Sequence, residues 1–222
     1  MELDEALATR RSIRAFRPDP VPEAAIRRML EAAARAPSGG NLQPWVVHVV
    51  SGAARDRLMA HIAEKARATP FGEGSWYDEY PKEMPEVFRE RRRKVGYDLY
   101  ALAGIAREDK MARAVQLMRN FILFDAPVGL FFSTHRCCGI PQFVDLGMFM
   151  QSVMLMARAE GLDTCAQEAW GIWHETVARF VGLPEDHRVF CGMALGYADT
   201  AAPVNRLHTE RAPVDEFATF LA

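Results

Sequence analysis

Apolar side chains recur at intervals of three and four residues along several segments of the chain, which is the spacing of helices that bury one face. In one of them, Ile26, Met29, Leu30 and Ala33 fall on the same face. The segment at residues 143–157 is apolar over more than half of its circumference, so it should be buried. In a dimer it would form the shared core. The predicted helices span residues 2–9, 22–35, 53–68, 107–119 and 143–157.

Three shorter runs are rich in apolar residues, which favours a buried strand at residues 46–50, a wholly apolar strand at 128–133 and a last strand at 188–195. The middle run should lie at the centre of a sheet. Helices and strands do not alternate regularly, so the order predicts an α+β layered fold in one domain of residues 1–222. Near the C-terminus, Pro213 and the acids after it predict a helix start, and Phe217, Phe220 and Leu221 should dock on an apolar surface.

Residues 69–85 are the least regular part of the chain, because prolines and glycines interrupt them. The segment carries Phe71, Trp76, Tyr77 and Tyr80, which either cap the core or cover a bound ligand. Aromatic faces suit flat substrates, since offset stacking adds about 0.5 to 1.5 kcal/mol beyond area burial. We therefore expect an active-site lid at about residues 69–104, with Phe71, Trp76 and Tyr77 as candidates for substrate contact.

A basic run at residues 88–94 follows this segment and resembles a nucleic-acid patch when it is taken alone. Tyr97, Tyr100 and Leu102 continue it with helical spacing, which favours a solvated helix face. The whole chain has 27 basic and 29 acidic side chains and a net charge of −2, so no global field attracts nucleic acid. We expect no nucleic-acid partner.

Composition, cysteine usage and the lack of an export signal bear on the cellular compartment. With 222 residues and 50% hydrophobic side chains, the chain can bury a substantial core. The four cysteines form no C-x-x-C motif and no disulfide framework, which suits a reducing cytoplasm. No export signal opens the chain, and Asp145, Gln151 and Ser152 interrupt its longest apolar run. We expect neither export nor a membrane span.

A loop at residues 36–45, A-P-S-G-G-N-L-Q-P-W, separates a predicted helix from a predicted strand. Pro37 ends the helix, and Gly39 and Gly40 permit positive φ and the close approach of a ligand. Ser38, Asn41 and Gln43 add short polar groups that would suit a flat, polar-rimmed ligand. An ordinary helix-to-strand connection remains the alternative at this point.

Residues 10–16, R-R-S-I-R-A-F, lie upstream of that helix. In an extended chain the period of two places Arg10, Ser12 and Arg14 on one side and Ile13 on the other. Guanidinium groups match phosphate oxygens, so this triplet is a candidate clamp for a phosphate monoester. A solvated basic face is the alternative, and the spacing leaves open whether Arg11 binds through its backbone or its side chain.

Other common sites find little support in the sequence. There is no G-x-G-x-x-G opening a βαβ unit and no P-loop motif, so a phosphate must be held differently. His135 and Cys137 are too few ligands for zinc, and no Ser-His-Asp or Cys-His set has convincing spacing. We therefore predict no metal site.

Taken in order, R-R-S-I-R-A-F and A-P-S-G-G-N-L-Q-P-W closely resemble the flavin-dependent nitroreductase family. The resemblance continues through residues 161–169, 196–199 and 210–213, and so covers nearly the whole chain. It implies a central sheet of short mixed or antiparallel strands packed by helices, in an intertwined homodimer with FMN at the subunit interface.

The resemblance also implies roles for particular residues. It adds Arg211 to the phosphate-binding set and assigns the 36–45 loop to the partner subunit, where it would touch the ring or the ribityl chain. A backbone N–H near Glu168 and Ala169 would face flavin N5, although the family often has glycine at the place of Ala169. The implied cofactor-binding residues are Arg10, Arg11, Ser12, Arg14, Pro37, Ser38, Gly39, Asn41, Gln43, Ala166, Gln167, Glu168, Ala169 and Arg211.

The implied activity is ping-pong reduction of nitroaromatics, quinones or similar flat acceptors with NAD(P)H, with the flavin carrying the chemistry and no catalytic side chain. Reductive dehalogenation and flavin fragmentation within the same family remain alternatives, as does a flavin-binding module without turnover. An interaction protein built on the basic helix at residues 89–94 is the alternative from a different functional class.

Overall fold

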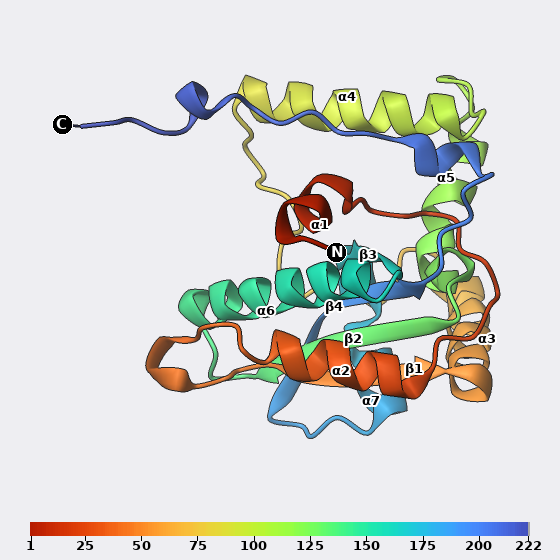
Figure 1. The fold of residues 1–222 in the computed structure, drawn as a ribbon. Helices are drawn as coiled ribbons and strands as arrows, with labels where there is room; N and C mark the ends of the chain where they lie inside the picture. The colour runs from red at the N-terminus through yellow and green to blue at the C-terminus, as the bar shows by residue number, and fades with distance from the viewer. Residues whose placement is uncertain (222) are drawn as a thin grey trace.

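A four-stranded antiparallel sheet with strand order β1-β2-β4-β3 forms the middle layer of the fold (Figure 1). The computed structural model describes residues 1–221. Its strands are β1 (Val46–Ser51), β2 (Val128–His135), β3 (Asp163–Gln167) and β4 (His187–Gly196). Its helices are α1 (Leu3–Thr9), α2 (Glu23–Ala33), α3 (Gly52–Ala68), α4 (Glu86–Leu102), α5 (Lys110–Met118), α6 (Ile140–Ala159) and α7 (His174–Val181). Five 3-10 segments connect them: η1 (Gly39–Asn41), η2 (Arg119–Asp125), η3 (Glu168–Trp173), η4 (Pro203–Arg206) and η5 (Val214–Glu216).

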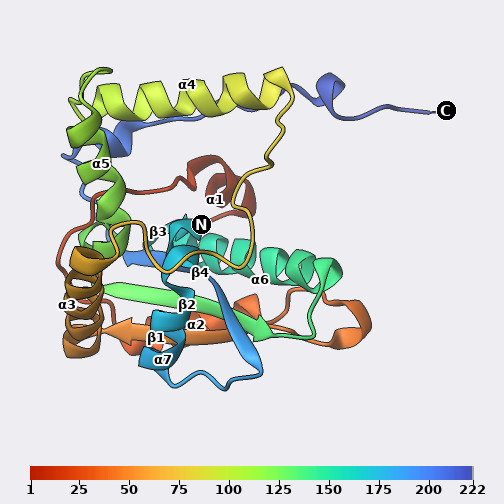
Figure 2. The same ribbon diagram turned by 180° about the vertical axis from the view of Figure 1, so that it is seen from behind.

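Each face of the sheet has its own hydrophobic core. Leu130 and Phe132 of β2 pack with residues of α2 and α6, whereas Phe131, between them, packs with residues of α3 and α7. This alternation follows from the period of two along a strand. Figures 1 and 2 show the two helical layers on opposite sides of the sheet. The predicted α+β layered fold is therefore confirmed.

The predicted strands at residues 128–133 and 188–195 are β2 and β4, and they form the two central strands. The run at residues 46–50 is also a strand, but the expectation that it is buried was wrong. β1 lies at one edge of the sheet, and Val49 is 42% exposed while Val50 is buried. A continuous apolar run does not distinguish an edge strand from a central one.

Two elements were not predicted from the sequence. β3 has only five residues, of which Asp163, Thr164 and Gln167 are polar, so it lacks an apolar run. It forms because its backbone pairs with β4 from Asp163↔Gly196 to Gln167↔Gly192. α7 is a short amphipathic helix that ends at Gly182, a glycine with the left-handed φ of 68°.

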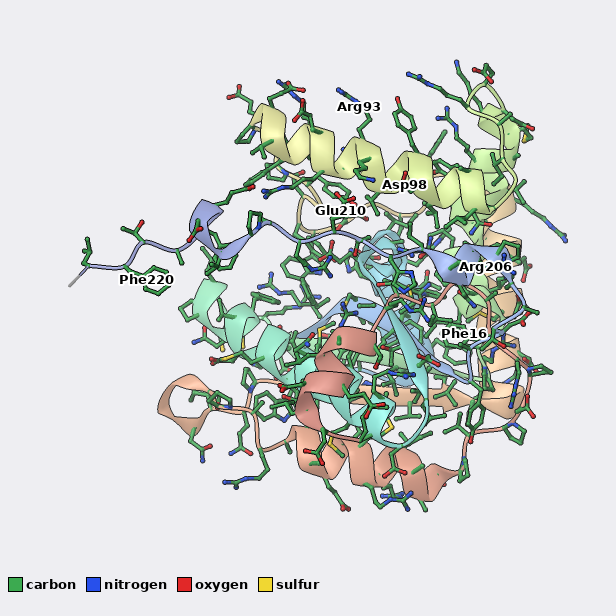
Figure 3. All side chains as sticks on the ribbon, turned by 45° about the horizontal axis from the view of Figure 1, so that its top comes forward. Phe16, Arg93, Asp98, Arg206, Glu210 and Phe220 are labelled. Atoms are coloured by element: carbon green, nitrogen blue, oxygen red, sulfur yellow. The ribbon has the colours of Figure 1, made fainter. Side chains whose placement is uncertain are left out.

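The C-terminal segment differs from the prediction. Instead of a helix after Pro213, the chain makes only the turn η5, and the final residues point away from the body (Figure 1). Phe217, Phe220 and Leu221 are 72%, 80% and 93% exposed, so they do not dock within this chain. Figure 3 shows the segment passing along α4, with Phe220 beyond it.

α6 is the core helix that the apolar pattern predicted. Leu146, Phe149 and Val153 are buried in the core between α6 and α2, while Ile140 and Val144 are 82% and 57% exposed. Among residues 1–221 it is also the one helix long and apolar enough to cross a membrane, judged by length and composition. Its packing against α1, α2 and β3 is that of a helix in a layered fold.

Candidate functional site

Arg10, Ser12 and Arg14 converge beside β3, as the extended spacing predicted. Ser12 forms a bridge with Thr164, and Ile13 points the other way and is buried. All three polar side chains influence the buried thiol of Cys165: burial raises its pKa, and Arg14, the Ser12 hydroxyl and Arg10 oppose that rise. The two guanidiniums and the hydroxyl therefore share one small region.

Arg211 brings a third guanidinium to this region from the C-terminal segment. Burial lowers the pKa of Arg10, and the nearby positive charge of Arg211 lowers it further. Arg211 itself donates from Nη1 to the Thr209 hydroxyl at 2.7 Å and to the carbonyl oxygens of Thr209 and Glu210. Among residues 1–221, neither arginine forms an ion pair with a carboxylate. Guanidinium groups that lack an acidic partner could bind an anion such as a phosphate monoester.

Arg11 contacts the segment around η4. Its Nη1 donates to the carbonyl oxygen of Asn205 at 3.1 Å and lies 3.2 Å from Nε2 of His208. Buried Asn205 also accepts from the backbone N–H of Arg14 at 2.7 Å and donates to the carbonyl oxygen of Ala15 at 2.8 Å. The Arg11 side chain thus holds η4 against the N-terminal segment, and Asn205 fixes the backbone that presents Arg14.

The 36–45 loop is ordered by its own polar groups. The Gly39 N–H donates to Oδ2 of Asp145 at 3.1 Å, and the Gln43 N–H donates to the Ser38 hydroxyl at 3.0 Å. Gly40, Asn41 and Gln43 adopt left-handed φ values of 58°, 56° and 49°. Gly39, which the sequence showed could also take a positive φ, does not do so. Two non-glycine residues in this conformation store strain, which tends to be found at functional sites.

The loop and the arginine cluster lie at opposite ends of α6. Asp145, near the start of the helix, anchors the loop. Arg158, near its end, donates to Oδ1 of Asp163 at 2.6 Å and to the Thr9 hydroxyl at 3.4 Å, next to Arg10. A helical rise of about 1.5 Å per residue places Asp145 and Arg158 roughly 20 Å apart along the axis.

Residues 166–169 continue β3 into η3. Gln167 is buried and donates from Nε2 to the carbonyl oxygen of Asn120 at 2.8 Å, whereas Ala166 and Glu168 face solvent. Although solvent reaches the Glu168 side chain, the protein atoms crowded around its carboxyl group raise its pKa, and Glu79 of the lid segment adds to the rise. Ala169 packs partly against the core.

The aromatic residues of the segment predicted to be a lid are placed differently from one another. Phe71 is 91% exposed. Trp76 donates from Nε1 to the carbonyl oxygen of Val189 at 2.8 Å, and the Tyr77 hydroxyl donates to the carbonyl oxygen of Phe190 at 2.8 Å. The guanidinium of Arg188 lies 3.8 Å from the Trp76 ring centroid. Trp76 and Tyr77 thus fasten the lid segment to β4.

The place of attachment on β4 is irregular. Between Phe132 and Ser133 the pairing with β2 shifts, so that Phe190 has no partner in the β2 register. A bulge of this kind frees backbone groups from the ladder. The Tyr77 hydroxyl, bound to the Phe190 carbonyl, supplies a donor there.

The model of the nitroreductase family matches residues 7–197. The chain belongs to the nitroreductase family. It is 36% identical to a nitrobenzene nitroreductase of Ectopseudomonas oleovorans and 34% identical to a 4-nitrobenzoate reductase of Pseudomonas putida, in each case over 99% of this chain and 96% of the relative. It also superposes with a TM-score of 0.96 on the FMN and NADPH-dependent nitroreductase NfnB of Sphigopyxis sp. strain HMH, at 43% identity and full coverage of both chains.

Three residues of this site received no role from the sequence: Asn205, Asp145 and Arg188. Asn205 lies within η4, and its contacts with Arg11 and Arg14 join positions more than 190 residues apart, so no local pattern marks it. Asp145 interrupts an apolar helix, and its function as the loop anchor explains why a carboxylate is tolerated there.

Proposed function

We propose that this nitroreductase-family protein is an FMN-dependent oxidoreductase that uses NADH or NADPH to reduce nitroaromatics, quinones or similar flat electrophilic acceptors. The two curated relatives above are named for nitrobenzene and 4-nitrobenzoate reduction, and NfnB for its dependence on FMN and NADPH. When bound, FMN would supply the redox chemistry for a ping-pong reaction between the nicotinamide donor and the acceptor. The side chains of this chain would bind the cofactor and orient it toward the substrates.

The observation that carries this proposal is the like-charged cluster of Arg10 and Arg211. Holding two guanidiniums together in a partly desolvated place costs free energy unless an anion neutralises them. A flavin phosphate would do so, with Ser12 and Arg14 completing the set. Arg11 would act indirectly, because its side chain holds the Asn205 segment that positions Arg14.

The 166–169 segment would face the ring of the cofactor. In this arrangement the backbone N–H groups near Glu168 and Ala169 would act as donors toward the ring edge, and Ala166 and Gln167 would border it. No side chain of the segment needs to act as nucleophile. Protons for the reduced acceptor would come from solvent.

A homodimer is part of the same proposal, because one subunit places the two halves of the site about 20 Å apart along α6. A second copy would bring its Pro37, Ser38, Gly39, Asn41 and Gln43 to the first copy's arginine cluster. The exposed apolar face of α6, with Ile140 and Val144, offers a surface for such a contact. So do the aromatic side chains of the C-terminal segment.

The proposal also covers the domain organisation, the lid and the cellular compartment. Residues 1–222 would act as one domain in which residues 69–104 form the lid. Trp76 and Tyr77 would hold that lid in place, while exposed Phe71 would be the aromatic residue free to meet a substrate. All four cysteines are free thiols, which suits a reducing cytoplasm.

An absorption spectrum of the purified protein, followed by turnover, tests the proposal. Flavin bands should be present and should bleach when NADPH or NADH is added without oxygen, and nitrobenzene should restore them. Released cofactor should be FMN by chromatography. A colourless protein that does not take up added FMN, or a flavin that neither nucleotide reduces, would contradict the oxidoreductase assignment.

A further inference from the structure

The two faces of α4 carry basic side chains with different surroundings. On one face Arg91 pairs with Glu216 and Lys94 pairs with Glu210 and Asp98, so the acidic C-terminal segment neutralises it. Arg93 projects to the side away from Glu210 (Figure 3). The basic run is therefore sorted by the fold into a paired face and an unpaired one.

The unpaired face forms one wall of a hollow of about 340 Å³ between α4 and α5. We call it the arginine groove, and it is lined by Arg89, Arg92, Arg93, Arg113, Tyr97 and Tyr100, together with Met84 and Gly96. Positions 89, 93, 96, 97 and 100 recur at helical spacing, so one strip of α4 supplies most of this wall.

One of the four arginines in the arginine groove has an acidic partner. Arg89 pairs with Glu86, but among residues 1–221 no carboxylate lies within 4.0 Å of the basic atoms of Arg92, Arg93 or Arg113. Instead the guanidinium of Arg113 lies 5.7 Å from the Tyr100 ring centroid, and that of Arg92 lies 3.9 Å from the Tyr80 centroid. Cations over partly exposed aromatic rings suit a ligand with phosphates and a planar base.

The groove continues into a larger hollow of about 910 Å³ beside the lid. The two share Met84, Arg89 and Arg92 as lining residues, so they are contiguous. The larger hollow is also lined by Ser75 and Tyr77. The Tyr77 hydroxyl lies 3.5 Å from the carbonyl oxygen of Glu168, in the segment proposed to face the cofactor ring. The larger hollow thus borders both the arginines and the residue that contacts Glu168, and its lining also includes the acidic residues Asp78, Glu79 and Glu83.

We propose that the arginine groove binds the adenosine phosphate half of the nicotinamide dinucleotide and favours the form that carries a 2′-phosphate. The proposal rests on the function above and names a site for its electron donor. Arg92, Arg93 and Arg113 bind the phosphates through their guanidinium forks, and the adenine lies against the faces of Tyr97 and Tyr100. The nicotinamide end extends along the larger hollow toward residues 166–169.

Binding to the flavin-loaded protein tests the groove without turnover. By isothermal titration, adenosine 2′,5′-bisphosphate should bind about tenfold more tightly than 5′-AMP, because the guanidinium groups form charge-assisted hydrogen bonds with the additional phosphate. In the variant R93E/R113E this preference should disappear. The charge-conserving R93K/R113K should keep binding but lose part of the preference, because lysine lacks the fork. R57E/R67E, on exposed α3, changes the net charge equally outside both hollows and should bind as the wild type does.

Kinetics give an independent readout. In R93E/R113E the KM for NADPH should rise about tenfold, with little change in the KM for NADH or in kcat. The proposal is wrong if the wild type does not distinguish the two adenosine phosphates, or if R93E/R113E keeps wild-type affinity and KM. It is also wrong if the variant instead raises the KM for 4-nitrobenzoate relative to nitrobenzene, which would make the groove a carboxylate site for the acceptor. The titration needs no turnover, and the KM values are measured only where NADPH reduces the flavin, so both results are distinct from failure of the proposed function.

Discussion

Arg10 and Arg211 lie close enough for the charge of one to lower the pKa of the other, although they come from opposite ends of the chain. Among residues 1–221, neither guanidinium forms an ion pair with a carboxylate that would offset this repulsion. This repulsion between two positive charges indicates that the motif at residues 10–14 belongs to an anion-binding site, because an anionic ligand would neutralise both guanidiniums.

Replacing Arg211 should weaken FMN binding selectively. R211A removes one charge-assisted contact to the phosphate, worth about 1.5 to 3 kcal/mol, so FMN affinity should fall by about one to two powers of ten. Riboflavin, which lacks the phosphate, should bind equally to wild type and variant. Fluorescence titration of the flavin-free protein measures both. If R211A weakens riboflavin as much as FMN, Arg211 does not act on the phosphate.

Mixed dimers should show whether the site is shared between subunits. R10E/R211E disables the phosphate cluster, and Gly40→Val distorts the loop because Gly40 has a φ of +58° that valine rarely adopts. Each homodimer should bind little FMN. In a heterodimer of the two variants, one site joins the intact cluster of one subunit to the intact loop of the other, so about one FMN per two subunits should return. Heterodimers that stay colourless would place the whole site in a single subunit.

Gly192 is expected to be intolerant of any side chain. A Cβ at this position would lie 2.4 Å from Cδ1 of Trp170, which is fully buried against Phe131 and Phe121. Gly192→Ala should therefore lower the free energy of unfolding by about 1 to 3 kcal/mol, as overpacking does. Urea unfolding measures the loss. Gly96→Ala in α4 meets no atom within 4 Å and should be neutral or slightly stabilising by the same assay.

The lid attachment should depend on the Tyr77 hydroxyl. Tyr77→Phe keeps the ring beside Phe190 but leaves the Phe190 carbonyl without this donor, at a cost of about 1 kcal/mol. Hydrogen exchange in residues 69–85 should accelerate while exchange in β2 stays unchanged. Faster exchange throughout the sheet would show that the hydroxyl supports the whole fold instead of the lid.

Glu168 should make the protein less stable as pH rises. Burial and Glu79 raise its pKa above the ordinary value of 4.5, so the folded state binds this proton more tightly than the unfolded state. Stability is then fully present below about 4.5 and falls as pH rises from there through the raised pKa. Thermal melts of wild type and Glu168→Gln across that window measure the effect. The variant should gain stability relative to the wild type toward higher pH, and parallel curves would contradict the assignment.

Several features could be predicted from the sequence because their causes are local. The alternation of Arg10, Ser12 and Arg14 with Ile13 follows from extended backbone geometry, and the structure shows it. Gly40 has the positive φ that the loop composition predicted. β3 could not be found in the same way, because a five-residue strand with three polar side chains exists only through its pairing with β4.

By itself, the sequence determined the helices with one apolar face, the central strand and the motifs that carry the family resemblance. These depend on spacing within about twenty residues, where side-chain periodicity and backbone preference act directly. Only the tertiary structure decided that β1 is an edge strand, that Trp76 and Tyr77 are tied to β4, and that Arg91 and Lys94 of the basic helix pair with acids of the C-terminal segment. Each of these is a contact between residues far apart in the chain, so its partner is set by packing and charge across elements and leaves no local pattern to read.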